Sequence, residues 1–216
     1  MVLATADTPP FVTESGDGFY NLLLTETFRR LDVPLEIRRM PSERALQEAN
    51  SGRVDGEFGR IAQIGDLYRD LRIVPEPLSD WHFSAFVRAG SAEPRSFEDL
   101  RNFHVGYIRG WKIYEDSVTD ARSVTIAASE EQLFSILLAR RVDVILYSRL
   151  RGLSWSERNP DAGISLVATP LAVRQMHLFL HHQREELIPG INGVLREIKS
   201  DGTYVRLQQE AFGFVP

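Results

Sequence analysis

Short apolar stretches alternate with segments of helical periodicity along the first sixty residues. Val2 to Ala6 is predicted to be a strand, and the spacing of leucine and phenylalanine predicts a helix from Phe19 to Leu31. Alternation predicts a strand from Leu35 to Met40, Ser42 can cap the helix that follows, and Val54 to Phe58 is the next predicted strand. This β-α-β-α-β order predicts a largely parallel sheet covered by helices.

The same order of elements recurs in the middle of the chain. His104 to Ile108 is predicted to be a strand, Gly110 opens a helix, and Val124 to Ala127 is the next strand. A capping box begins at Ser129, because Gln132 can return a hydrogen bond to the cap. The helix after this box is predicted to reach residue 140, and a strand to cover residues 142–147.

Two identical tripeptides occupy the same place in the two runs. Arg53-Val54-Asp55 and Arg141-Val142-Asp143 each lie between the end of a predicted helix and the start of a predicted strand. A match of three residues arises easily by chance, but the shared structural position favours two similar lobes.

Two further strand-like stretches, Phe83 to Val87 and Met176 to His181, flank the second half. Two crossings of this kind predict two lobes joined by a double hinge, with the C-terminal helical patterns returning to the first lobe. We therefore predict that lobe one comprises residues 1–86 and 178–216, and that lobe two comprises residues 88–175. Clefts between lobes are common small-molecule sites.

Composition narrows the classes of function. The chain has 216 residues with 25 Lys and Arg, 30 Asp and Glu, no Cys and a net charge of −5. Scattered basic residues and a negative net charge argue against a nucleic-acid partner. The lack of cysteine excludes disulfides, thiolate catalysis and cysteine-ligated metals. His177 and His181 would suit a metal on a helix, but on a predicted strand they lie roughly 13 Å apart.

Neither a membrane span nor a signal peptide is evident in the sequence. No apolar run approaches the roughly 18 residues that a transmembrane helix needs. The first residues lead straight into polar ones, unlike a signal peptide. If the protein is exported, we expect its signal to have been removed.

Short motifs follow one another along the chain: Asp7-Thr8-Pro9-Pro10-Phe11, Gly18-Phe19-Tyr20, residues 50–56, residues 96–101 followed by residues 104–107, residues 141–144, and Ser200-Asp201-Gly202-Thr203-Tyr204. In this order they resemble the motifs of the family-3 (amino-acid-binding-like) extracytoplasmic solute-binding proteins. The first resembles the family's PPF opening, residues 50–56 resemble its SG-x-x-D segment, and the last resembles its C-terminal DGT-(Y/F) signature.

This resemblance implies an α/β, two-lobed, type II periplasmic binding fold. Each lobe would have a mixed, mostly parallel sheet flanked by helices, and two strands would form the hinge. The implied protein is a periplasmic monomer without cofactor or catalytic activity, which binds a small molecule and delivers it to the membrane permease of an ABC importer. The alternatives are a ligand-sensing input domain of a membrane signalling protein and a dehydratase-like enzyme, for which Glu57 is the one candidate general acid.

The sequence departs from the family where amino acids are bound. The family's Gly-Thr pair after the lobe-two strand is replaced by Arg109-Gly110-Trp111-Lys112, and the acid that binds the ligand ammonium is replaced within Tyr147-Ser148-Arg149. These departures argue against an α-amino acid as the ligand.

Candidate ligand-binding residues are those just beyond the carboxyl ends of the strands, where parallel α/β sheets bind ligands. The resemblance implies that Arg60 takes a carboxylate in a two-pronged bond, although it could instead pair with Asp66 or Glu57. A second arginine, Arg109, is either a ligand contact or a charge at the cleft rim. A ligand with an anionic group, a carboxylate, is therefore predicted. The other candidates are Asp7 (ligand contact or turn cap), Phe11 and Trp111 (stacking on the ligand or packing), Trp81 (cleft wall or hinge packing), Gly110 and Tyr147.

Overall fold

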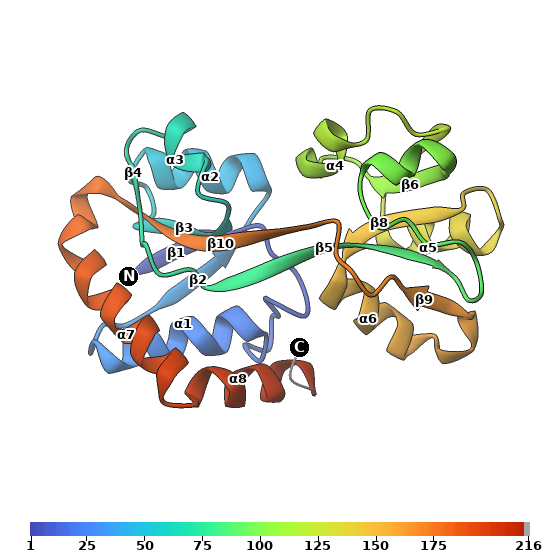
Figure 1. Cartoon of the computed structure of the whole chain (residues 1–216). Helices are drawn as coiled ribbons and strands as arrows, with labels where there is room; N and C mark the ends of the chain where they lie inside the picture. The colour runs from blue at the N-terminus through green and yellow to red at the C-terminus, as the bar shows by residue number, and fades with distance from the viewer. Residues whose placement is uncertain (214–216) are drawn as a thin grey trace. The chain divides into compact units, whose positions relative to one another are not determined.

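The computed structural model describes residues 1–213, except the side chain of Lys112. The chain forms two compact units (Figure 1). Unit 1 comprises Met1–Asp80 and the chain from Gln175 onward, and unit 2 comprises Trp81–Arg174. Both divisions fall inside long strands, β5 (Ser79–Arg88) and β10 (Ala172–His181). The predicted divisions, at residues 86–88 and 175–178, lie further along the same two strands.

Unit 1 is built on a sheet with the order β2-β1-β3-β10, to which β4 adds beside β10. Strand β1 is parallel to both neighbours, whereas β10 is antiparallel to β3 and β4. Aromatic and aliphatic residues of α1 are fully buried and form much of the core. The elements are β1 (Val2–Thr5), β2 (Glu36–Arg39), β3 (Gly56–Arg60), β4 (Leu71–Ile73), α1 (Phe19–Arg30), α2 (Ser42–Asn50), α3 (Ile64–Leu67), the 3-10 helix η3 (His182–Leu187), α7 (Ile188–Ser200) and α8 (Thr203–Phe212).

Unit 2 is built on a sheet with the order β9-β5-β8-β6-β7. Strand β6 is parallel to β7 and β8, and β5 is antiparallel to β8 and β9. In its core, Phe134 stacks on Trp155 with 3.8 Å between ring centroids. The elements are the 3-10 helix η1 (Glu98–Asn102), β6 (His104–Ile108), α4 (Lys112–Ser117), β7 (Ser123–Ala127), α5 (Glu130–Leu138), β8 (Val144–Ser148), α6 (Arg149–Arg158), the 3-10 helix η2 (Pro160–Ala162) and β9 (Ile164–Leu166).

The repeated tripeptides perform the same task in the two units, which share one strand order, β2-β1-β3-β10 and β7-β6-β8-β5. Asp55 accepts a hydrogen bond from the backbone N–H of Val2 at 2.7 Å, and Asp143 accepts one from the backbone N–H of His104 at 2.9 Å. In return, the backbone N–H of Asp55 donates to the carbonyl of Val2, and that of Asp143 donates to the carbonyl of His104, both at 2.8 Å. Asp55 therefore joins the start of β1 to the start of β3, and Asp143 joins the start of β6 to the start of β8.

Several local predictions need correction. Ser42 is the first residue of α2 rather than its cap. The capping box of Ser129 forms, but Gln132 returns its hydrogen bond to the N–H of Ala128. The helix predicted to open at Gly110 begins at Lys112.

Within residues 1–213, no helix is long and apolar enough to cross a membrane. The same residues contain no group of three or more His, Asp or Glu side chains suited to hold a metal ion. The two histidines at i, i+4, His177 and His181, lie in β10.

Candidate ligand-binding site

Arg60 ends β3, and its guanidinium is engaged within unit 1. Its Nε and Nη2 donate to Oε1 of Glu57 at 2.8 and 2.5 Å, and Nη2 also donates to the carbonyl of Ser42 at 3.1 Å. The side chain of Glu57 is fully buried. Of the two interpretations of Arg60, the structure therefore shows the pairing with Glu57. A ligand carboxylate at Arg60 would have to share the guanidinium with this buried acid.

Acidic groups surround this ion pair. Burial raises the pKa of Glu57 to about 7, against the lowering effect of Arg60, and the charges of Asp7 and Glu43 add to the rise. Oε2 of Glu57 has no hydrogen-bond partner among the described residues. Asp7 lies against Gly59, where a Cβ atom would come within 2.0 Å of its Oδ2. The carboxyl group of Glu57 is thus close enough to Asp7, which follows β1, and to Glu43, in α2, for their charges to act on it.

Phe11 lies in the core of unit 1. Its side chain is 1% exposed, and its ring lies 5.1 Å from Tyr20 and 5.9 Å from Phe212 between centroids. Of the two interpretations of Phe11, stacking on a ligand or packing inside the lobe, the structure therefore shows packing.

Unit 2 gathers five aromatic side chains at its strand ends, which we call the aromatic cluster. Trp111 stands at its centre, stacked on Tyr114 at 5.6 Å and 5.1 Å from Tyr147 between centroids. Trp81 and Phe83, both in β5, lie 6.3 and 6.0 Å from Trp111. The sequence predictions for Trp81, Trp111 and Tyr147 thus fall on one cluster.

Arg151, in the first turn of α6, packs on this aromatic cluster and was missed by the sequence analysis. Its guanidinium carbon lies 5.2 Å from the ring centroid of Trp81 and 6.0 Å from that of Trp111. Burial raises the pKa of the Tyr147 phenol above its ordinary value, and the nearby charge of Arg151 opposes this rise with a smaller effect. The cluster therefore holds a cation, which cation–π attraction stabilises.

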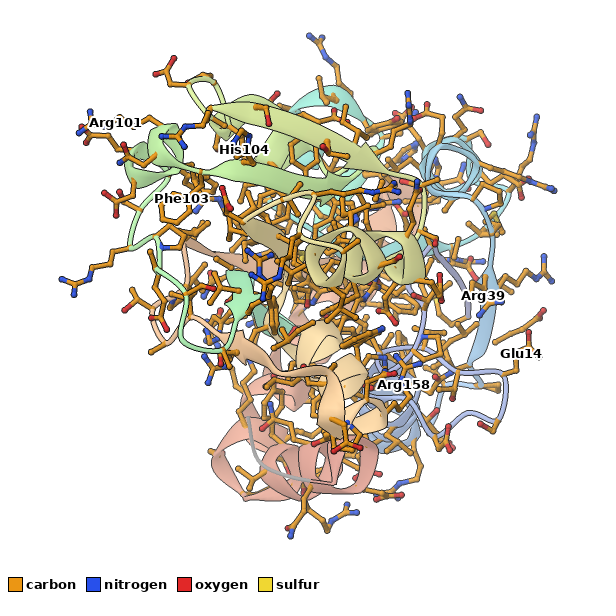
Figure 2. The ribbon with its side chains drawn as sticks, turned by 90° about the vertical axis from the view of Figure 1, so that its right-hand side faces the viewer. Glu14, Arg39, Arg101, Phe103, His104 and Arg158 are labelled. Atoms are coloured by element: carbon orange, nitrogen blue, oxygen red, sulfur yellow. The ribbon has the colours of Figure 1, made fainter. Side chains whose placement is uncertain are left out.

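A second polar link leads from Tyr147 to the far end of α6. The hydroxyl of Tyr147 donates to Oε2 of Glu130 at 3.0 Å. The other carboxylate oxygen of Glu130 accepts from Arg158, in the last turn of α6 (Figure 2), at 2.8 Å. Tyr147 is only 4% exposed and its hydroxyl is engaged within unit 2, so its contact with a ligand stays a prediction.

The loop after β6 carries the two remaining candidates. Arg109 is exposed, and its backbone N–H donates to Ala127 at 3.0 Å. The N–H of Gly110 donates to Glu115 at 2.8 Å, so this donor already has a partner inside unit 2. Gly110 has a φ of +86°, which favours glycine, and this explains the residue without a ligand.

Residues 1–214 match the protein family described as bacterial extracellular solute-binding proteins, family 3. The chain belongs to this family. The resemblance found in the sequence motifs is thereby confirmed over nearly the whole chain.

Solved structures of family-3-like ligand-binding proteins share the fold. The GluR0 ligand-binding core in complex with L-glutamate has a TM-score of 0.84 and 14% identity, over 99% of this chain and 98% of that one. A histidine kinase sensor domain with similarity to periplasmic binding proteins has a TM-score of 0.77 and 19% identity, over 100% and 97%. The substrate-binding protein of an amino acid ABC transporter has a TM-score of 0.72 and 20% identity, over 99% of both chains. The predicted two-lobed type II fold is confirmed, while the ligand-binding roles stay predictions.

Proposed function

We propose that this family-3 protein binds a small polar solute bearing a carboxylate in the periplasm and presents it to the membrane permease of an ABC importer. The observation that carries the proposal is the arginine held on the aromatic cluster at the strand ends of unit 2. Membership of the family and the likeness to the substrate-binding protein of an ABC transporter support the transport role. The proposed role is binding without catalysis and without a cofactor.

The chemistry of the cluster suits such a solute. An arginine fork can donate two parallel hydrogen bonds to a carboxylate. Aromatic side chains offer large apolar faces to the rest of a small ligand. The ends of parallel strands are also where α/β sheets bind their ligands. Unit 2 therefore has both kinds of contact in one place.

A sensory role is the second candidate. The likeness to a histidine kinase sensor domain favours it, because the same fold serves there as an input domain. The two roles differ in the cell. A strain without the gene should lose uptake of the solute if the protein serves transport, and should lose a response to the solute while uptake continues if it serves sensing.

A thermal-shift screen of small acids, amino acids, polyamines and sugars tests the binding proposal. A solute at 100 times its Kd stabilises the folded state by about 2.7 kcal/mol, which shifts the Tm of a protein of this size by roughly 5–10 °C. We expect at least one carboxylate to produce such a shift. A shift with polyamines or neutral sugars alone would contradict the carboxylate, and the absence of any shift would contradict solute binding.

A further inference from the structure

We infer that the outer edge of β7 (Ser123–Ala127) binds a second copy of this chain, whose own β7 pairs with it antiparallel around a two-fold axis at Thr125. The inference concerns a surface of unit 2 that the proposed function does not use, and neither depends on the other. A dimer of this kind replaces the monomer that the family resemblance implies.

The backbone of β7 is paired with another strand on one side only, within residues 1–213. β7 is the last strand of the unit 2 sheet and pairs there with β6 alone. Just before β7, the backbone N–H of Arg122 donates to the carbonyl of Phe103 at 3.0 Å, so residue 122 faces β6. Backbone groups point to alternate sides along a strand, and those of Ser123 and Thr125 therefore point away from β6. A further strand would find its hydrogen-bond partners there.

The other outer strands of the described chain have the protection that sheet edges usually have. Natural proteins keep edges from pairing with other chains by charged side chains or by very short strands. The edge strand β2 has the sequence Glu36-Ile37-Arg38-Arg39, and β4 and β9 have three residues each. In contrast, the five residues of β7, SVTIA, include no charge and no proline. The edge of β7 is therefore suited to pairing.

The side chains on one face of β7 are apolar and exposed. Val124 and Ile126 lie two residues apart and so point to the same face, and they are 41% and 44% exposed. In the β6–β7 ladder they lie beside Val105 and Tyr107, both of which are buried. The apolar face of the sheet thus continues past β6 to the edge. A second strand at this edge would remove the two exposed side chains from water, which favours association.

The charges at the ends of β7 favour an antiparallel copy as the partner. Arg122 precedes the strand and Glu131 follows it in the first turn of α5, and both are exposed. Of the neighbouring acids, Glu130 is paired with Arg158, and Asp120 lies further from the strand. An antiparallel copy brings the arginine end of each strand toward the glutamate end of the other, whereas a parallel copy would align like charges. A contact in which both copies use the same surface also closes on itself as a dimer.

The register follows from the backbone groups that point outward. Residues that exchange both backbone hydrogen bonds lie directly opposite each other in an antiparallel ladder. Thr125, at the centre of β7, pairs in this way with Thr125 of the second copy, and Ser123 then lies opposite Ala127. Val124 of each copy lies opposite Ile126 of the other, in a pair without backbone hydrogen bonds, where side chains are closest. The two apolar contacts are thus equivalent and flank the axis.

Sedimentation velocity of the parent from about 1 μM to about 1 mM tests for the dimer, because a small interface gives a dissociation constant within this range. We expect monomer at the low end and dimer at the high end. Ile126→Lys places an unpaired charge against Val124 of the other copy and should weaken dimerisation at least about tenfold. As a matched control, Val205→Lys on α8 changes a residue that is 46% exposed and should dimerise like the parent.

A charge swap tests the register and the identity of the partner. Val124→Glu and Ile126→Lys should each dimerise weakly alone. An equimolar mixture of the two variants should form a heterodimer, because residue 124 of one copy lies opposite residue 126 of the other.

Cysteine variants give a second measure of the register. The chain has no Cys, so one introduced cysteine can form a disulfide only with another copy. Opposed Cα atoms about 5.5 Å apart suit a disulfide, and oxidised Thr125→Cys should therefore cross-link quickly. Ser123→Cys should cross-link at least about tenfold more slowly, because its two copies lie roughly 13 Å apart along the strands.

The inference is overturned if the parent stays monomeric up to about 1 mM, even where the edge of β7 then binds a strand of a different protein. It is also overturned if Ile126→Lys dimerises like the parent, if the mixture forms no heterodimer, or if Thr125→Cys cross-links no faster than Ser123→Cys. Urea midpoints show whether each variant folds, and the two cysteine variants decide if the charged variants do not. A monomeric parent that binds a solute would overturn the dimer and leave the proposed function in place.

Discussion

Replacing Glu57 by Gln should remove one loss of stability that the parent protein suffers as pH rises. The carboxyl of Glu57 is fully buried, and burial raises its pKa from 4.5 to about 7 in the folded protein. An acid whose pKa is raised by folding stabilises the protein below its unfolded pKa, and this contribution is lost as pH rises through the folded pKa. The relevant window therefore runs from about pH 4.5 to about pH 7.

The size of the effect follows from these two pKa values. At about 1.4 kcal/mol for each pH unit between them, ionising Glu57 costs the folded protein about 3 kcal/mol. Glutamine has nearly the same shape and cannot ionise, and its amide oxygen can still accept a hydrogen bond from Arg60. The stability of Glu57→Gln relative to the parent should thus rise by about 3 kcal/mol between pH 4.5 and pH 8.

Urea denaturation followed by circular dichroism, at half-unit steps between pH 4.5 and 8, measures this difference. Subtracting the parent curve removes the contribution of the other titrating groups. Glu157→Gln, which removes one charge from an exposed site on α6, controls for the change in net charge. A Glu57→Gln curve that stays parallel to the parent curve across this range would show that Glu57 ionises without a penalty and would refute the reasoning.

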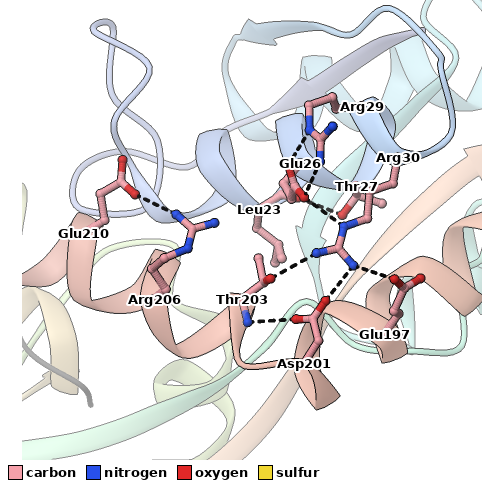
Figure 3. A network of polar contacts seen from close by, with 10 residues as sticks. All are labelled: Leu23, Glu26, Thr27, Arg29, Arg30, Glu197, Asp201, Thr203, Arg206 and Glu210. Carbon is pink, nitrogen blue, oxygen red and sulfur yellow. Dashed lines mark hydrogen bonds and ion pairs between the residues drawn. The ribbon is translucent and has the colours of Figure 1, made fainter.

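Two further predictions concern stability. Arg30→Gln breaks the network that joins α1 to α7 and α8 (Figure 3), in which Arg30 bonds Glu26, Asp201 and Thr203 at 2.8–3.0 Å. Hydrogen bonds from Arg29 and then Arg30 lower the pKa of Glu26 from 4.5 to about 2, so this stabilisation is lost as pH falls; the variant's urea midpoint should drop at pH 7 and much less at pH 2.5. Gly152→Ala should cost roughly 1–3 kcal/mol, because its Cβ would lie 2.0 Å from the ring of Phe86. Gly193→Ala in α7, where nothing lies within 4 Å, should instead stabilise by roughly 1 kcal/mol, and equal effects in urea titrations would contradict the packing argument.

The sequence predicts most of the elements because burial repeats with the period of each element. It predicts β6 to the residue, but it starts β3 and β8 two residues too early. Val54 and Val142 are buried, yet each precedes the aspartate that ties two strands together, and the ladder starts only after it. The helix α6 was missed because Gly152 and two serines weaken its apolar pattern. A glycine is needed at position 152 because the ring of Phe86 leaves no room for a Cβ atom, and the local sequence does not reveal this contact.

The candidate site was only partly predictable for a related reason. In a regular strand, residues i and i+3 point to opposite faces, so the sequence could offer the pairing of Arg60 with Glu57 only as an alternative. A bulge in the β3–β10 pairing and a φ of +83° at Gly59 turn the end of β3 and bring the two side chains together. Arg151 was not predicted because the helix that carries it, α6, was not predicted. The sequence analysis had nevertheless identified the adjacent segment, residues 147–149, as the place where the family's ammonium-binding acid is missing.

The two units differ in the charges that lie at the ends of their strands. Asp7 follows β1 in unit 1, and Arg109 follows β6, the strand with the same place in unit 2. In unit 1 the buried Glu57 occupies Arg60, and the nearby charges of Asp7 and Glu43 already raise the pKa of this acid. A further carboxylate brought to Arg60 would meet the same repulsion, and for this reason the proposed function rests on the arginine that lies over the indole rings of unit 2.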